Sequence, residues 1–165
     1  MNNACVFSAD RRHRYTLMHR PDPLFSEGRL LMWVGLNPST ADERQLDPTL
    51  TRILGYSLRE GYAGFIMTNL FAWRATDPKD MKAASDPIGS DNDHWLLECA
   101  RRCRKVVAAW GSHGSFRNRD AQVCELLRDF EVVCLARNAD GAPGHPLYLK
   151  KTAPFAPFAP GRFQP

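Results

Sequence analysis

The sequence lacks long apolar runs: none approaches the roughly 20 residues needed to span a membrane, so no membrane-spanning helix is predicted. Residues 1–7 also lack the basic segment, the long apolar stretch and the small-residue cleavage site of a secretory signal. No internal repeat is present. We therefore expect a cytoplasmic protein that makes no contact with a membrane.

Cysteine offers no recognisable pairing motif. The five cysteines are odd in number, and none belongs to a C-x-x-C pair that has a matching second pair. Cys99 and Cys103 lie four residues apart on a predicted helix, where they form either half of a metal site or one buried helix face. The buried face is the favoured interpretation, and neither a metal nor any other cofactor is expected.

Charge of neither sign dominates the chain. Lys and Arg number 22 against 18 Asp and Glu, which gives a net charge of +4 and permits nucleic-acid binding without requiring it. Much of the excess lies in residues 11–14 and 101–105, clusters that are typical of solvated faces. Hydrophobic residues make up 44% of the chain and charged residues 24%, as in an ordinary globular protein.

Apolar runs and helical spacings alternate along the chain. Strands are predicted at residues 4–9, 14–19, 29–35, 64–70, 105–110 and 131–135. Helices are predicted from Pro48, capped by Asp47 and ended by Gly61, then over 90–104 and 119–128. This order favours a three-layer α/β/α domain over residues 1–152, with a mainly parallel four-stranded central sheet plus a short N-terminal β-hairpin. The Pro/Phe-rich tail, residues 153–165, either lies extended and mobile or packs its phenylalanines on this domain.

Polar and Gly/Pro residues follow four of the predicted strands. These residues are Gly35 to Ser39, Asn69, Trp110 to His113, and Gly144 to Pro146. Each group alone consists of residues that are common in turns. Because ligands gather at the carboxyl ends of parallel strands, their recurrence predicts one pocket with a close backbone approach and amide and imidazole hydrogen-bonding groups.

Several motifs along the chain resemble one family. They are Gly35-Leu36-Asn37-Pro38-Ser39-Thr40-Ala41-Asp42, Asp47-Pro48-Thr49, Asn69 to Pro78, Asp86-Pro87-Ile88-Gly89, Ala109-Trp110-Gly111 and His145 to Leu149. The family is a bacterial and phage one known only as domain of unknown function 1643. The resemblance covers nearly the whole chain before the tail, but such a family implies no activity.

The same landmarks, in the same order, more distantly resemble the uracil-DNA glycosylase superfamily. Gly35-Leu36-Asn37-Pro38 resembles its water-positioning loop, and the strand ending in Asn69 resembles its base-recognising strand. Trp110-Gly111-Ser112-His113 resembles a later strand end, and His145-Pro146-Leu147 keeps two residues of its His-Pro-Ser loop. The resemblance implies a uracil-DNA glycosylase-like fold, a nucleotide flipped out of its stack and cleavage of its glycosidic bond.

Specific roles follow from this resemblance. It implies that Asn37 orients the attacking water and His145 stabilises the departing base, as the two catalytic residues. The implied substrate-binding residues are Gly35, Leu36, Pro38, Ser39, Asn69, Phe71, Trp110, Gly111 and His113. The residues expected to contact nucleic acid are Arg52, Arg74, Leu147, Tyr148, Lys150 and Lys151.

The glycosylase pattern leaves one charged cluster unexplained. Asp42, Asp47, Arg52, Arg74 and Asp77 either cap helices and hold loops together, or bind a substrate phosphate or sugar through the two arginines.

Three functional hypotheses remain open. The chain is an enzyme acting on the N-glycosidic bond of a damaged or modified base or nucleoside, a non-catalytic module that binds nucleotides or nucleic acid through the same pocket, or a protein-contact domain. A nucleic acid or nucleotide is the expected partner, and no protein partner can be named.

Overall fold

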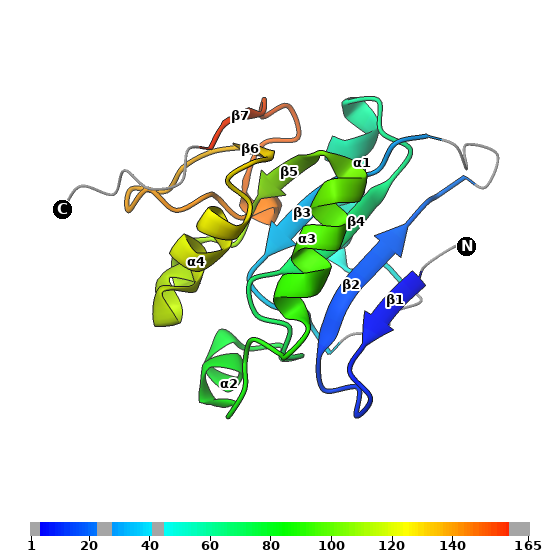
Figure 1. Ribbon diagram of the computed structural model, residues 1–165. Helices are drawn as coiled ribbons and strands as arrows, with labels where there is room; N and C mark the ends of the chain where they lie inside the picture. The colour runs from blue at the N-terminus through cyan, green and yellow to red at the C-terminus, as the bar shows by residue number, and fades with distance from the viewer. Residues whose placement is uncertain (1–3, 23–27, 41–44, 159–165) are drawn as a thin grey trace.

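The computed structural model describes residues 4–22, 28–40 and 45–158, and the strands among them form one mixed sheet of seven (Figure 1). The strand order is β1-β2-β4-β3-β5-β6-β7. Asp42 of the charged cluster and residues 159–165 of the tail lie outside the described residues. The predicted α/β class is confirmed.

Four parallel strands occupy the centre of the sheet. They are β3 (Leu31–Gly35), β4 (Phe65–Asn69), β5 (Lys105–Ala108) and β6 (Glu131–Cys134). β3 pairs with β4 on one side and with β5 on the other, and β5 pairs with β6. The predicted strand locations are confirmed, with ends that differ by at most two residues.

The N-terminal hairpin is part of this sheet rather than a separate addition to it. β1 (Ala4–Phe7) and β2 (Arg14–His19) pair antiparallel, as predicted. β2 also pairs antiparallel with β4, so that Leu17 lies opposite Met67. The sheet is therefore larger and more mixed than the sequence indicated, because the outer edge of β4 pairs with β2.

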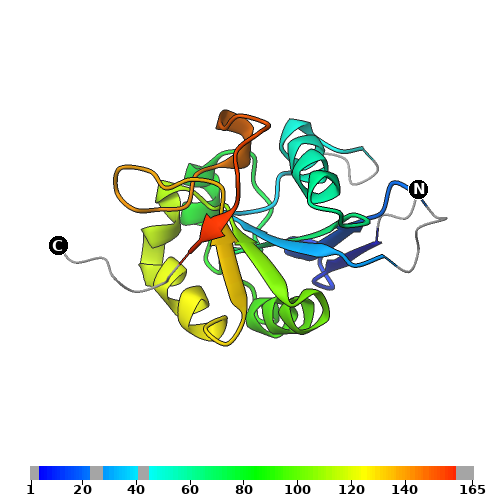
Figure 2. The ribbon, with the colours of Figure 1, turned by 90° about the horizontal axis from the view of Figure 1, so that it is seen from above.

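Helices cover both faces of the sheet, as Figures 1 and 2 show. α1 (Pro48–Arg59) packs on one face, while α3 (Asn92–Cys103) and α4 (Arg119–Leu126) pack on the other. α2 (Pro78–Ala83) was not predicted, since six residues are too few to show a helical period. None of the helices among the described residues is both long and apolar enough to cross a membrane.

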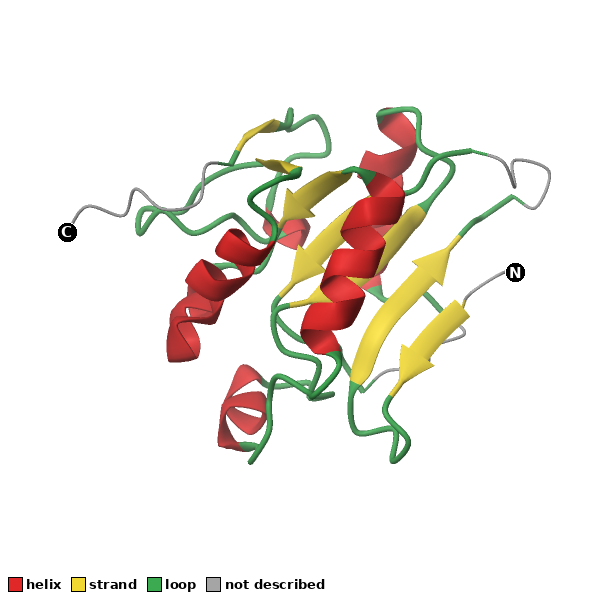
Figure 3. Ribbon diagram, viewed as in Figure 1, coloured by secondary structure: helices red, strands yellow, loops and turns green. Residues whose placement is uncertain are grey.

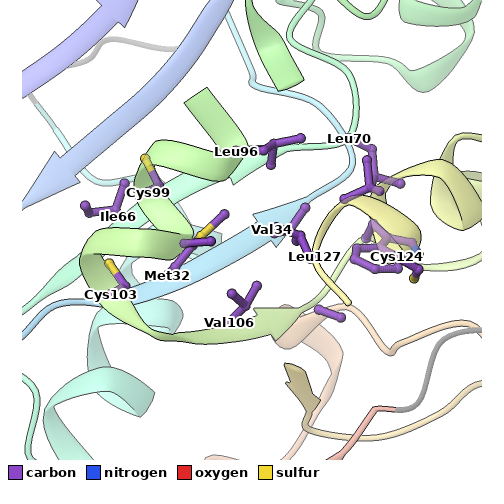
Figure 4. Packing of buried hydrophobic residues seen from close by; sticks show 14 of the residues in the cluster. Met32, Val34, Ile66, Leu70, Leu96, Cys99, Cys103, Val106, Cys124 and Leu127 are labelled. Carbon is purple, nitrogen blue, oxygen red and sulfur yellow. The ribbon is translucent and has the colours of Figure 1, made fainter. Parts of the chain in front are cut away.

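Side chains alternate between the two faces along each central strand. Leu31 and Trp33 of β3 belong to the apolar cluster beneath α1, whereas Met32 and Val34 belong to the cluster beneath α3 and α4 (Figure 4). All four are buried. Burial on both faces explains why β3 appears in the sequence as an uninterrupted apolar run.

β3 lies between the two strands that follow it in the chain, β4 on one side and β5 on the other. From β3 the chain passes through α1 to β4 on one side, then returns through α2 and α3 to β5 on the other side (Figure 3). The loops that follow β3 and β5 consequently leave toward opposite faces of the sheet. Such a switch point opens a crevice at the carboxyl ends of the strands, where ligands bind in open α/β sheets.

The tail adds the last strand. β7 (Ala156–Pro157) pairs antiparallel with β6. Phe155 and Phe158 lie three positions apart, which places them on opposite sheet faces. Phe155 contacts Trp33 with 5.9 Å between ring centroids, and Phe158 contacts Trp110 at 5.6 Å. As far as residue 158, the tail packs its phenylalanines on the domain, which was one of the two predicted alternatives.

Candidate active site

A pocket of about 660 Å³ lies at the carboxyl edge of the central strands, at the switch point. Its walls come from the loops after β3, β4 and β5, the first turn of α1, and the segment 144–149. Most of the predicted site residues line it together: Gly35, Leu36, Asn37, Pro38, Ser39, Asn69, Trp110, Gly111, His113, His145, Leu147 and Tyr148.

Five predicted residues lie elsewhere. Phe71 is fully buried in the core, where its ring centroid lies 5.7 Å from that of Phe116. Arg52 and Lys151 line a neighbouring groove, and Arg74 lines a shallow pocket near the hairpin turn. Lys150 contributes its backbone carbonyl to the Tyr56 hydroxyl at 2.7 Å.

The Asn37 side chain is fixed through its nitrogen. Nδ2 donates hydrogen bonds to the carbonyl oxygens of Ala75 at 2.8 Å and Pro38 at 3.2 Å. Its Oδ1 accepts no hydrogen bond from any residue that the structure describes, and this oxygen is accessible to solvent. This arrangement holds the amide rigidly while leaving a carbonyl acceptor for water or a ligand.

The Asn69 amide is buried in the pocket wall against Gly35. Asn69 is 2% exposed, and its Oδ1 has no hydrogen-bond partner among the described residues. A Cβ on Gly35 would lie 2.8 Å from that oxygen and 2.5 Å from the Met67 methyl carbon, Cε. A side chain at position 35 would therefore force Met67 or Asn69 to shift. An unsatisfied buried acceptor costs free energy, and a ligand donor would offset that cost.

The backbone that carries Asn69 is held by two buried residues that the sequence analysis missed. Asn92 Nδ2 donates to the carbonyls of Asn69 at 3.0 Å and Leu70 at 2.9 Å. Arg119 donates to the Leu70 carbonyl at 2.9 Å and to Asp93 at 2.5 Å. A signal was present, because Asn92 begins the buried series 92, 96, 99 and 103 of α3. A polar residue at a core position is informative in this way.

His145 presents a proton on Nε2. Its Nδ1 accepts a hydrogen bond from the Leu147 backbone nitrogen at 3.2 Å, which places the proton of the neutral ring on Nε2. Burial lowers the pKa of His145, and the negative charge of Asp47 partly opposes that shift. The ring is therefore a neutral hydrogen-bond donor near pH 7, able to stabilise a developing anion.

Two charged residues, Arg14 and Asp47, line the pocket although the sequence did not predict this. Arg14 lines the pocket and is 4% exposed, so the expectation that residues 11–14 form a solvated face is wrong for this residue and for buried His13. β2 lies inside the sheet, which buries its first residue. Asp47 lines the pocket as well, and it also accepts a hydrogen bond from the Leu50 nitrogen at 2.8 Å. Asp47 and Asp77 cap α1 and α2, as the capping alternative predicted.

No thiol takes part in the pocket. Cys99 and Cys103 lie on the buried face of α3 (Figure 4), which confirms the buried-face interpretation. Burial raises the pKa of Cys99 to about 12 and that of Cys103 to about 11. Thiols with such pKa values are poor nucleophiles at neutral pH. Of the five cysteines, all of which the structure describes, none lines the pocket.

A basic groove adjoins the pocket. It has a volume of about 750 Å³, runs along α1, and shares Leu147 with the pocket. Arg52, Arg59 and Lys151 line it together with apolar residues. Arg52 donates to the Leu147 carbonyl at 3.3 Å, and Arg59 donates to the Lys151 carbonyl at 2.9 Å. The groove therefore meets the pocket at Leu147, with Arg52 beside this junction, whereas Arg59 at the end of α1 forms an ion pair with Glu60 at 2.8 Å.

Comparison with known families gives one match. The model of the family described as "Protein of unknown function (DUF1643)" matches residues 14–147, which is most of the chain. Neither the curated proteins nor the solved structures give a match to the chain. The more distant resemblance to uracil-DNA glycosylases therefore remains a prediction.

Proposed function

We propose that this chain, which belongs to the DUF1643 family of proteins of unknown function, hydrolyses the N-glycosidic bond of a damaged or modified base in a nucleoside or nucleic acid. One observation carries the proposal: Asn37, Asn69 and His145, from three distant parts of the chain, line the same pocket. Glycosidic cleavage needs a held water, a recognised base and a stabilised leaving group around one sugar.

The architecture supports the same proposal. Helices on both faces of a parallel centre, with the pocket at its carboxyl edge, suit the three-layer α/β/α, uracil-DNA glycosylase-like arrangement that the resemblance implies. In this interpretation, β1, β2 and β7 extend that core on its two edges.

Each of the three side chains has a role that its contacts allow. The Asn69 amide pairs with one edge of the base, which satisfies its buried Oδ1. Asn37 holds the attacking water through Oδ1, because its nitrogen is engaged with the Ala75 carbonyl. His145 donates from Nε2 to the departing base, whose negative charge grows as the bond breaks. A pocket of about 660 Å³ lies within the range of small-molecule sites.

A non-catalytic nucleotide-binding or nucleic-acid-binding module is the second candidate. It is favoured by the amide of Asn37, since an amide cannot accept the proton of water as a general base. The basic groove serves this alternative equally well, because Arg52 and Lys151 beside the pocket suit phosphate contacts.

Labelled oligonucleotides distinguish the two candidates. Single- and double-stranded DNA containing uracil, other deaminated bases or mismatches is incubated with the protein and then treated with alkali, which breaks the strand at an abasic site. We expect cleavage that disappears in Asn37→Ala and in His145→Ala. His94→Ala is the matched control, because His94 is an exposed histidine of α3 that does not line the pocket.

The outcomes separate cleanly. Salt-dependent binding without cleavage of any substrate supports the binding module. Failure of both cleavage and binding refutes the nucleic-acid proposal and leaves the protein-contact hypothesis. Cleavage that persists in both pocket variants shows that the activity comes from another site or another protein.

A further inference from the structure

Asp47 places a carboxylate in the pocket wall, ten residues after Asn37 in the sequence. Asp47 precedes α1, and the first turn of this helix, including Thr49 and Leu50, also lines the pocket. The carboxylate is anchored by the hydrogen bond from the Leu50 nitrogen to Oδ1 at 2.8 Å. Its orientation is therefore set by the helix end rather than by a flexible loop.

The His145 ring lies in the electric field of this carboxylate. The short helix 146–148, which follows His145, packs against α1. The negative charge of Asp47 acts on the His145 ring, where it opposes the effect of burial. The other groups that can carry charge around them are Arg14 and His113 in the pocket wall, Tyr148 beside His145, and Arg52 on α1.

We propose that Asp47 is the catalytic carboxylate of this pocket, and that it takes the proton of the water that Asn37 orients. The inference rests on the proposed glycosidic activity and supplies the group that Asn37 cannot provide. An amide oxygen accepts a hydrogen bond but does not take up a proton near pH 7, whereas a carboxylate does both. A negative charge beside the sugar also stabilises the cationic character that the sugar acquires as its bond to the base breaks.

The step is balanced. The water oxygen bonds to the anomeric carbon as the bond from that carbon to the base nitrogen breaks. The electron pair of the broken bond leaves with the base, whose anion is held by His145 Nε2–H. Asp47 receives the water proton and later releases it to solvent, while the base anion takes up one proton from solvent. The products are a sugar hydroxyl and a neutral base.

Asp47→Asn tests this role, because asparagine is as good an N-cap as aspartate and keeps an oxygen for the Leu50 nitrogen. The matched control is Asp77→Asn. Asp77 caps α2 by the same chemistry, through a 2.8 Å hydrogen bond from the Lys79 nitrogen, but it is exposed and does not line the pocket. The substrate is the lesion-bearing oligonucleotide that the unaltered protein cleaves most rapidly, and the rate is measured in a single turnover.

We expect the cleavage rate of Asp47→Asn to fall by about 10²- to 10⁴-fold, with an unchanged dissociation constant for the oligonucleotide. Asp77→Asn should stay within about threefold of the unaltered protein. Thermal unfolding is recorded for both variants. If Asp47→Asn is unfolded at the assay temperature, Asp47→Ser repeats the test with another good cap that has no charge.

A second measurement does not depend on activity. The ring signals of His145 are titrated by NMR in the unaltered protein and in Asp47→Asn, where loss of the negative charge should lower the pKa of His145 further. An unchanged His145 pKa, or an active protein whose rate survives Asp47→Asn, overturns this inference and leaves the proposed function standing. Absence of cleavage by the unaltered protein overturns the proposed function, and the catalytic role of Asp47 with it.

Discussion

Asn92 offers a direct test of how the fold positions the pocket. It is fully buried at the start of α3, and Nδ2 donates to the carbonyls of Asn69 and Leu70 at 3.0 and 2.9 Å. Replacing Asn92 with alanine removes both hydrogen bonds. The Leu70 carbonyl keeps its hydrogen bond from Arg119, whereas the Asn69 carbonyl loses its side-chain donor.

The cost follows from these contacts. Each lost hydrogen bond is worth about 1 kcal/mol net, and burial of the poorly paired acceptor adds about 1 kcal/mol or more. We therefore expect Asn92→Ala to lower the free energy of unfolding by about 2–4 kcal/mol. Asn92→Asp, which has the same shape, should cost more, because it buries a carboxyl group against two carbonyl oxygens.

Urea unfolding followed by tryptophan fluorescence measures both effects, provided that the variants keep the same slope of unfolding free energy against urea concentration. Asn138→Ala is the control for loss of an exposed amide, here one that donates to the Ser112 hydroxyl at 3.1 Å, and should cost less than about 0.5 kcal/mol. A loss below about 0.5 kcal/mol in Asn92→Ala, or an Asn92→Asp protein more stable than Asn92→Ala, would refute the proposed support of the β4 end.

Three further predictions test other parts of the molecule. Gly35→Ala should weaken oligonucleotide binding, measured by calorimetric titration, and lower stability by about 1–3 kcal/mol, because the new Cβ would lie 2.8 Å from Asn69 Oδ1; unchanged binding contradicts it. Phe158→Ala should destabilise the protein by about 3 kcal/mol in thermal unfolding, since the ring is 3% exposed, whereas a mobile tail would give no change. Burial lowers the pKa values of His19 and His145 below 6.5, so the folded protein takes up protons less readily than the unfolded chain. The contribution of the two neutral histidines to the free energy of unfolding should be fully present above that pH and be lost as the pH falls below it. Replacing either histidine with asparagine should reduce this loss, measured by unfolding at a series of pH values.

Much of the local structure could be predicted from the sequence, because local signals determine it. The unbroken apolar run of β3 predicts a strand buried on two faces, and Asp47-Pro48 predicts the start of α1. The polar strand ends also predicted the candidate pocket, since carboxyl ends of parallel strands share one edge of a sheet. α2 escaped prediction because six residues, fewer than two helical turns, are too few to show a period.

Partners that are distant in sequence account for what was missed. Arg14 belongs to a cluster of four basic or histidine residues, yet β2 lies between β1 and β4 in the sheet and the Arg14 side chain is buried beside the pocket. Phe71 adjoins the Asn69 strand end in the sequence, yet its ring packs in the core against Phe116. β4 ends at Asn69, so the alternation of side chains along a strand does not extend to Phe71, and proximity in sequence did not place this side chain in the pocket.

The sequence by itself determined the α/β class, the places where strands and helices form, and the polar residues at the strand ends, because period, capping and turn chemistry act over a few residues. Only the tertiary structure decided that the hairpin and tail extend one sheet, and that Asp47 and Arg14 line the pocket with Asn37 and His145. Edge pairing and side-chain convergence depend on contacts between residues far apart in the chain, which no local pattern encodes.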